Sequence, residues 1–240
     1  MSYANGPRIV TDGLVLCVDP NNPKCWDGSS STITDMARGL SLIKGANTVA
    51  TTFNGQRVFG SSSSSGTLDT GYRYSNAVVS SASSWTISGW IYKSSNTVSN
   101  WWHVYTDAAS GDILTIYNVN LAFRTSMNNI NSGGTFTTGS DVTDYGVNWN
   151  QLDNGWINIV LIYSSSGQYL QLYLNNSAQP QQTGRVINTN YQLRNFYGWG
   201  SANGSYYFNQ NHSHTTVYNK ALSAYEITQN YNALKGRFGL

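Results

Sequence analysis

Aromatic side chains in polar loops are the residues of this sequence best suited to bind a ligand. They stand among Gly and Asn residues, and they are Trp101, Trp102, Trp149, Tyr197, Trp199, Tyr206 and Tyr207. Indole and phenol rings stack on sugar rings or anchor protein interfaces, and neighbouring Asn amides bond hydroxyl groups. Burial in a core is the third interpretation, which we expect for Trp85, Trp90 and Trp156 because they lie in strand-like segments. The loop set is therefore a candidate glycan- or partner-binding surface.

Acidic side chains do not form the pattern that glycoside hydrolysis requires. That reaction needs two carboxylates across one glycosidic bond. Of the 11 acidic residues only Glu226 is a glutamate, and the closest pair, Asp141 and Asp144, flanks a turn-like segment. The sequence also lacks a G-x-S-x-G nucleophile turn and a glycine-rich phosphate loop. We therefore expect a protein without enzymatic activity, and glycan hydrolysis is the third-ranked function.

Metal binding has two sets of candidate ligands. His212 and His214 are two positions apart, so a regular strand would place them on one face, where a third ligand could complete a metal site. The alternative is that both histidines are exposed or hydrogen-bonded. Calcium would instead use loop oxygens. The candidates for this are Asp19, Asp27, Asp107 and Asp112. Their spacing follows no ordered ligand pattern, so we assign no cofactor and leave calcium open.

The two cysteines, Cys17 and Cys25, are close enough in sequence to pair across a short loop. The opening "MSYANGPRIV" has neither the basic nor the apolar region of a secretory signal. No apolar run approaches the ~20 residues of a membrane helix. We therefore expect a soluble protein made in a cytoplasm, where two free thiols are favoured over a disulfide.

Charge and composition exclude some partners and favour a fold class. Only 10% of the residues are charged and the formal net charge is +2, without the clustered basic stripe of a nucleic-acid-binding protein. The 17 Tyr, 8 Trp and 23 Gly suit strands joined by short polar turns. No composition break divides the 240 residues. We predict one domain over 1–240, with an N-terminal arm over 1–8.

Alternation with a period of two marks the strands. In "SWTISGWIY" (84–92), Trp85 and Ile87 share one face while Thr86 and Ser88 share the other. "GWINIVLIY" and "QYLQLYLN" are joined by a Ser/Gly turn at 164–167 and predict a hairpin, with the leucines of the second strand facing a core. Strands do not alternate with helices, so the pattern favours an all-β sandwich or barrel. A single jelly-roll sandwich is the simplest interpretation.

One helix is predicted at the end of the chain, over 223–235. Ser223 and Glu226 have the spacing of a capping box, and Ile227 begins an apolar face with helical spacing. Lys235 and Gly236 are expected stop signals. The apolar face of this helix is expected to pack on a sheet.

Several segments together resemble a known group. They are "GPRIVTDGLVLCVDPNNPKCW" (6–26), "WTISGWIY", "GWINIVLIYSSSGQYLQLYLNNS" and "TVYNKALSAYEITQNYNALKGRFGL" (216–240). These resemble the LamG-like, concanavalin A-like domains of structural proteins from tailed bacteriophages. The likeness does not extend over 93–150 or 178–210. It implies a jelly roll of two antiparallel sheets with a short C-terminal helix, and it carries no catalytic motif.

The resemblance also implies a place of action. It implies a virion protein, a capsid decoration or a fibre- or tail-associated protein, whose partners are other virion proteins and copies of itself. We further expect Arg237 and Phe238 to dock on a neighbouring subunit. The alternative function is a carbohydrate-binding adhesin that recognises host surface glycans, and the two functions are compatible.

Overall fold

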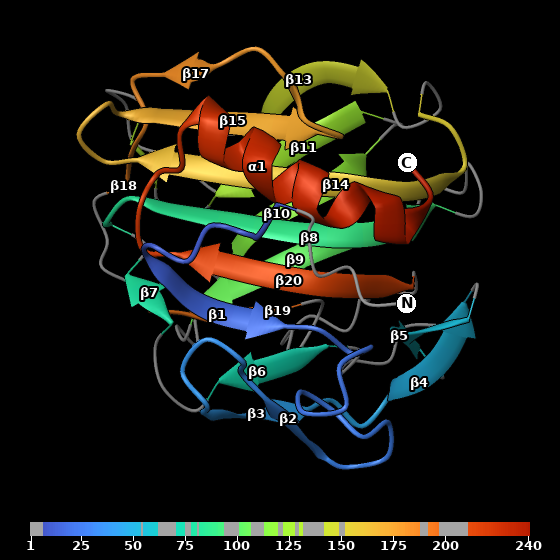
Figure 1. Ribbon diagram of the computed structural model, residues 1–240. Helices are drawn as coiled ribbons and strands as arrows, with labels where there is room; N and C mark the ends of the chain where they lie inside the picture. The colour runs from blue at the N-terminus through green and yellow to red at the C-terminus, as the bar shows by residue number, and fades with distance from the viewer. Residues whose placement is uncertain are drawn as a thin grey trace.

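Two antiparallel sheets pack face to face, and a single helix lies across the outer face of one of them (Figure 1). The computed structural model describes residues 7–53, 55–61, 71–74, 78–80, 82–93, 101–106, 113–119, 122–127, 130–131, 142–148, 152–187, 192–196 and 211–240. At 61, 74 and 192–195, and within 101–148, only the backbone is described. This arrangement confirms the predicted all-β sandwich with a short C-terminal helix.

The sheet under the helix, here the helix-covered sheet, has nine strands. In order across the sheet they are β16 (Ser177–Ala178), β15 (Tyr169–Leu174), β14 (Gly155–Ser164), β8 (Trp85–Lys93), β20 (His212–Tyr218), β5 (Gln56–Ser61) and β4 (Thr48–Phe53), while β1 (Leu14–Val18) pairs with β20 and β17 (Gln182–Thr183) pairs with β15. The predicted hairpin is confirmed, since Tyr163 of β14 is the register partner of Leu170 in β15.

The second sheet also has nine strands. In order they are β13 (Val142–Asn148), β11 (Ala122–Met127), β10 (Ile113–Val119), β9 (Trp101–Thr106), β19 (Gln192–Phe196), β6 (Tyr72–Tyr74), β3 (Ser41–Lys44) and β2 (Thr32–Thr34), while β7 (Val79–Ser80) pairs with β19. A separate two-stranded pair joins β12 (Ile130–Asn131) to β18 (Val186–Ile187). Consecutive strands of the second sheet are antiparallel where their pairing is described.

The core lies between the sheets and follows the predicted alternation. Ile87 and Ile91 of β8 are buried in one cluster with Leu172 of β15 and Phe196 of β19. Trp85 belongs to the same cluster, as expected. Trp90 and Trp156 are also buried, but on the outer face of the sheet against Phe238, so the expectation that they lie in the core between the sheets is wrong.

The helix α1 (Ala224–Leu234) packs on the outer face of the helix-covered sheet (Figure 1). Ile227 is buried against Val160, Ile162 and Tyr218, so the predicted apolar face is confirmed. The capping box is also present: Ser223 Oγ accepts a hydrogen bond from the Glu226 amide, and the Glu226 carboxylate accepts one from the Ser223 amide. This box satisfies two donors that the start of a helix otherwise leaves unpaired.

The α-helix ends as predicted, with Leu234 as its last residue and Lys235 as its C-cap. The chain then continues into the 3-10 helix η2 (Lys235–Phe238), which was not predicted, and Gly239 takes the left-handed conformation with φ 79°. This extra turn is held by packing, since the ring of Phe238 lies 4.1 Å from that of Trp90. This stacking draws the last residues back onto the sheet.

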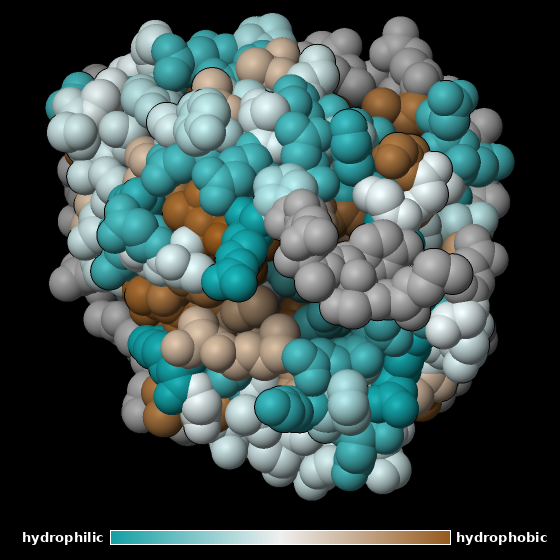
Figure 2. Space-filling model, viewed as in Figure 1, coloured by the Kyte–Doolittle hydropathy of each residue, from teal (hydrophilic) through white to brown (hydrophobic). Residues whose placement is uncertain are grey.

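Hydrophilic side chains predominate on the face that carries the helix, and apolar residues show there as small separate patches (Figure 2). The large hydrophobic residues described as exposed are Leu40, Ile43, Tyr225 and Leu240. Among the described residues, no helix is long and apolar enough to cross a membrane.

Candidate functional site

The C-terminal segment is bound to the sandwich by polar contacts as well as by stacking. Arg237 Nη1 and Nη2 each donate to one carboxylate oxygen of Asp19 at 2.6 Å, and Arg237 Nε donates to Gln56 Oε1 at 2.7 Å. Burial opposes ionisation of Asp19, but the hydrogen bond and charge of Arg237 outweigh it and lower the pKa of this carboxyl. Arg237 and Phe238 are thus engaged within the chain, and their docking on a neighbour stays a prediction.

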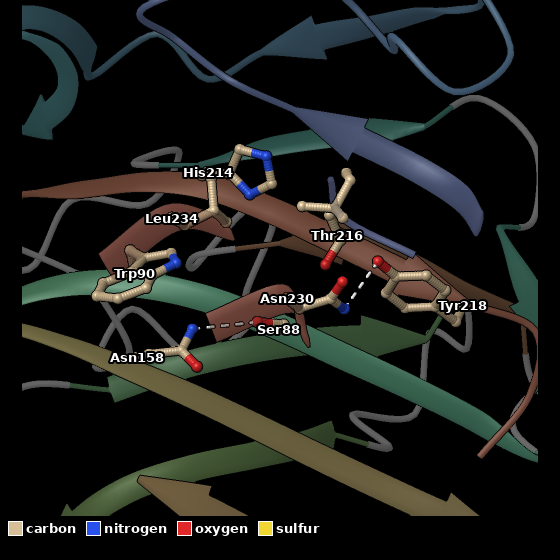
Figure 3. Close-up of a pocket in the computed structure, with 9 residues that line it drawn as sticks. Ser88, Trp90, Asn158, His214, Thr216, Tyr218, Asn230 and Leu234 are labelled. Atoms are coloured by element: carbon tan, nitrogen blue, oxygen red, sulfur yellow. Dashed lines mark hydrogen bonds between the residues drawn. The ribbon is translucent and has the colours of Figure 1, made fainter. Parts of the chain in front are cut away.

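The two histidines of β20 lie on opposite faces of the strand. His212 pairs with Ile91, and its ring lies 5.2 Å from that of Phe59 in the core. His214 lies on the outer face, in the pocket under α1 (Figure 3). The register of β20 against β8 shifts between Ser213 and Thr216, and such a bulge inserts one residue and reverses the alternation. The prediction that both histidines share a face is therefore wrong.

The remaining metal candidates are separated from one another. Asp19 is bound to Arg237, while Asp27 is exposed and accepts hydrogen bonds from the amides of Ser29 and Ser30. Asp107 and Asp112 lie outside the described residues. Within the described ranges, no group of three or more His, Cys, Asp or Glu side chains could hold a metal ion. Calcium binding stays an untested prediction.

Cys17 and Cys25 are both free, as predicted, and both are buried. Burial, reinforced by the nearby carboxylate of Asp19, raises the pKa of the Cys17 thiol to about 12. Burial likewise raises the pKa of Cys25 to about 12. A thiol of such high pKa is a poor nucleophile at neutral pH, because the thiolate is the reactive form.

A small polar pocket separates α1 from the helix-covered sheet. It is lined by Ile9, Ser88, Trp90, Asn158, His214, Thr216, Tyr218, Asn230 and Leu234. Asn158 Nδ2 donates to Ser88 Oγ at 3.3 Å, and Asn230 Nδ2 donates to the hydroxyl of Tyr218 at 3.0 Å (Figure 3). The Trp90 indole nitrogen, on the side that faces the other lining residues, is buried without a hydrogen-bond partner in the described part of the chain.

The size of this pocket decides its role. Its volume of about 10 Å³ gives room for roughly one water molecule. Sites for small organic ligands are typically about 300–1,000 Å³. The pocket is therefore a packing gap between the helix and the sheet, and it is too small to hold a sugar. Sequence analysis missed it, although Asn158 stands out as a polar residue inside the apolar run "GWINIVLIY".

The second sheet brings chemically different residues into one line. Trp101 of β9 is the register partner of Tyr117 in β10, Tyr117 is the partner of Arg124 in β11, and Arg124 is the partner of Asp144 in β13. We call this line of four residues the β9–β13 row. It combines two aromatic residues, a cation and a carboxylate across four neighbouring strands.

The register also separates the row from the core. Phe196 of β19 is fully buried between the sheets and is the register partner of Val104 in β9. With a period of two, Val104 and Trp102 belong to one alternating set, and Trp101 belongs to the other. Val104 is paired with the buried Phe196 and so belongs to the core-facing set. Trp101, and with it the β9–β13 row, belongs to the other set.

The aromatic residues predicted as a loop surface are only partly placed. Trp101 and Trp102 are the first two residues of β9, so their predicted position in a loop is wrong. Strand pairing with β10 extends over both residues, which their polar surroundings in sequence did not indicate. The others lie outside the described residues: Trp149, Tyr197, Trp199, Tyr206 and Tyr207.

Comparison with known proteins defines the class of fold. No protein-family model matches the chain, and no curated protein sequence matches it either. Trypanosoma rangeli sialidase in complex with the inhibitor DANA has a similar structure, with a TM-score of 0.63 and 12% identity over 97% of this chain and 34% of that chain. The binding domain of Paraclostridial Mosquitocidal Protein 1 gives a TM-score of 0.62 and 13% identity over 92% of this chain and 52% of that chain.

A third similar structure is a mutant of HCR D/C VPI 5995, with a TM-score of 0.58 and 14% identity over 93% of this chain and 53% of that chain. The chain thus spans between about a third and a half of the length of these structures. At these identities the likeness concerns the fold, which is a β-sandwich of the lectin-like, jelly-roll type.

Proposed function

We propose that this chain is a lectin-like binding domain without enzymatic activity, and that it binds a glycan through the β9–β13 row. The register that aligns Trp101, Tyr117, Arg124 and Asp144 is the observation that carries this proposal. Aromatic rings stack on sugar faces, a guanidinium donates paired hydrogen bonds, and a carboxylate accepts hydrogen bonds from hydroxyl groups. Arg and Asp are residue types that are mostly exposed in folded proteins, which favours an accessible row.

The outer face of the helix-covered sheet is covered in part by the C-terminal residues, which supports the same choice. There α1 buries Ile227 on the strands, and η2 stacks Phe238 on Trp90. The pocket that remains between helix and sheet is too small for a sugar. The neighbours are consistent with a binding role, since one is a sialidase solved with sialic acid and another is named as a binding domain.

Four of the described carboxylates are bound within the fold, which supports a role without catalysis. Asp19 is paired with Arg237, and Asp12 and Glu226 are both paired with Lys220. Asp35 is fully buried and accepts hydrogen bonds from the amides of Cys17 and Ala37. Each of these groups is thus engaged in holding the fold.

Display on a phage particle is the finer part of the proposal. It rests on the resemblance of 6–26 and 216–240 to phage structural proteins, and it makes the sandwich a virion component that contacts other virion proteins. Mass spectrometry of purified particles and a cryo-EM map would test it. We expect the chain to be present in a fixed ratio to the other virion proteins, with its second sheet facing outward. Absence of the chain from the particles would overturn this part of the proposal alone.

Glycan binding is tested by titration on the isolated protein. A glycan array would select sugars, acidic ones included, and tryptophan fluorescence would give the affinity. We expect Tyr117→Ala and Arg124→Ala each to weaken binding about tenfold or more, as for a central contact. Tyr225→Ala removes an exposed aromatic ring from the helix and serves as the matched control. The proposal fails if no glycan binds, or if the control loses as much affinity as the row variants.

A further inference from the structure

The strands at the ends of the two sheets differ in how well they are protected. Exposed edge strands invite pairing with other chains, and proteins protect them by shortness, charge, proline or coverage. At one end of the second sheet, β2 has three residues, and its Thr34 amide donates to the carbonyl of Cys25 at 2.7 Å. At the other end, β13 carries the charged Asp144.

The helix-covered sheet has one protected and one unprotected end. At the first end, β16 and β17 have two residues each, and Pro180 lies between them. At the other end, β4 has six residues, "TVATTF", with no charge and no proline. Its register with β5 runs from Thr48 to Phe53 without a bulge. Of these four ends, β4 alone shows none of the protective features within the described residues. The further edge strand β1 is covered, because its Cys17 amide donates to Asp35 and its Cys17 carbonyl accepts from the Met36 amide.

The hydrogen bonds of Thr48 show which peptide groups of β4 point outward. Its amide donates to the carbonyl of Gly45 at 3.1 Å, and its carbonyl accepts from Lys44 Nζ at 2.6 Å, so both groups are bonded outside the β4–β5 ladder. Alternate residues of an antiparallel strand turn their N–H and C=O to the same side. Ala50 and Thr52 therefore direct their peptide groups away from β5, and both side chains are exposed. No other segment within the described ranges bonds to these groups.

We propose that β4 pairs with β4 of a second copy of this chain, antiparallel about a twofold axis at Thr51. Ala50 of each copy then lies opposite Thr52 of the other, and four N–H···O hydrogen bonds form across the axis. A register that places Ala50 opposite Ala50 would bring Thr52 against Thr48, whose groups are already bonded to Gly45 and Lys44. The pairing joins two helix-covered sheets into one continuous sheet.

This dimer has a consequence for ligand binding, which rests on the function proposed above. The β9–β13 row belongs to the second sheet, and β4 belongs to the helix-covered sheet. Each dimer would therefore carry two rows, and binding to a surface with many glycans would gain from avidity. The dimer itself does not depend on a glycan and is tested without one.

A charge introduced on the outward edge of β4 tests whether this strand forms the dimer interface. Analytical ultracentrifugation of the purified chain over a range of concentrations should show a monomer–dimer equilibrium. We expect Thr52→Lys to shift it to monomer, because two like charges would lie diagonally across the twofold axis, about 7–8 Å apart at the backbone, and would repel each other. Thr32→Lys adds the same charge to the exposed edge strand β2 and should dimerise like the wild type. A wild-type chain that stays monomeric at every concentration, or a Thr52→Lys chain that still dimerises, overturns the proposal.

Cross-linking tests the register. In the proposed pairing the two copies of Thr51 face each other as a pair without hydrogen bonds, with Cα atoms about 4.5 Å apart, within disulfide range. Thr51→Cys should therefore form a covalent dimer under mild oxidation, while Val49→Cys, which would face Phe53, should not. The native cysteines are both buried and do not compete. Cross-linking of Val49→Cys but not of Thr51→Cys would overturn the register.

Discussion

Arg237 holds Asp19 in a two-pronged ion pair, with two hydrogen bonds of 2.6 Å, although the two residues are 218 positions apart in sequence. The two side chains are only 19% and 14% exposed, so solvent screens the pair weakly. The contact joins the loop after β1 to the last turn of the chain. It also places a guanidinium beside the stacked ring of Phe238.

Removal of one partner of this pair should destabilise the fold. Arg237→Met keeps much of the side-chain volume but leaves the Asp19 carboxylate without its cation. A fully buried pair costs about 3–5 kcal/mol to break in this way, and partial exposure reduces our expectation to about 2 kcal/mol. Urea denaturation followed by tryptophan fluorescence measures this. Lys220→Met, which breaks the more exposed pairs with Asp12 and Glu226, is the control and should change stability less.

Stability should fall as the pH is lowered from about 6.5 towards 4. Burial lowers the pKa of His214 from 6.5 to about 4, so between these values the unfolded chain binds a proton that the folded chain does not. Folding is then favoured above this window, and roughly 3 kcal/mol of stability is lost across it. Asp19, whose pKa is also lowered, adds a further loss at still lower pH, below its ordinary value of 3.8. Urea midpoints measured at several pH values should flatten above pH 4 in His214→Gln; an unchanged slope would contradict this assignment.

Two substitutions at Ser223 test whether the hydrogen bond of the capping box stabilises the fold. Ser223→Ala should cost about 1 kcal/mol of unfolding free energy, because the Glu226 amide loses its acceptor. Ser223→Asp keeps an acceptor at the same position and should retain most of the stability. Equal losses in the two variants would mean that the cap does not contribute. Thermal and urea denaturation on matched samples give the comparison.

Truncation of the stacked ring should release the C-terminal segment. Phe238 is 6% exposed and its ring lies 4.1 Å from Trp90 and 4.8 Å from Trp156. Phe238→Ala should cost about 3 kcal/mol, at the lower end for a buried phenylalanine near a chain end. Limited proteolysis should then cut after Lys235 or Arg237 much faster than in the wild type. Leu240→Ala, at a residue 49% exposed, should leave the cleavage rate unchanged.

The parts of the fold that sequence analysis predicted are those decided by local pattern. The hairpin of β14 and β15 follows from alternation around a Ser/Gly turn, and α1 follows from the Ser223–Glu226 box. The 3-10 turn after the helix was not predicted, because the stacking of Phe238 on Trp90, a tertiary contact, holds it. The placement of His212 and His214 on opposite faces was not predicted, because it results from a bulge in the pairing of β20 with β8. The residues of β20 alone do not predict this bulge.

The candidate site was predictable in kind but not in position. Aromatic residues were expected to bind the ligand, and Trp101 was among them. Tyr117, Arg124 and Asp144 were not, because they come next to Trp101 only through the register of four strands, and their spacing in sequence follows no period. Residues that line up across several strands of a sheet have no regular spacing in the sequence by which they could be recognised.

The sheet order also governs when the protein can fold. β1 finds its strand partner in β20, and Asp19 finds its cation at position 237. During synthesis β1 must therefore remain without its strand partner, with the apolar residues Leu16 and Val18 incompletely covered, until His212–Tyr218 has been made. Such long-range closure makes folding slow. Over that interval the incompletely covered apolar residues of β1 are open to contacts with other chains.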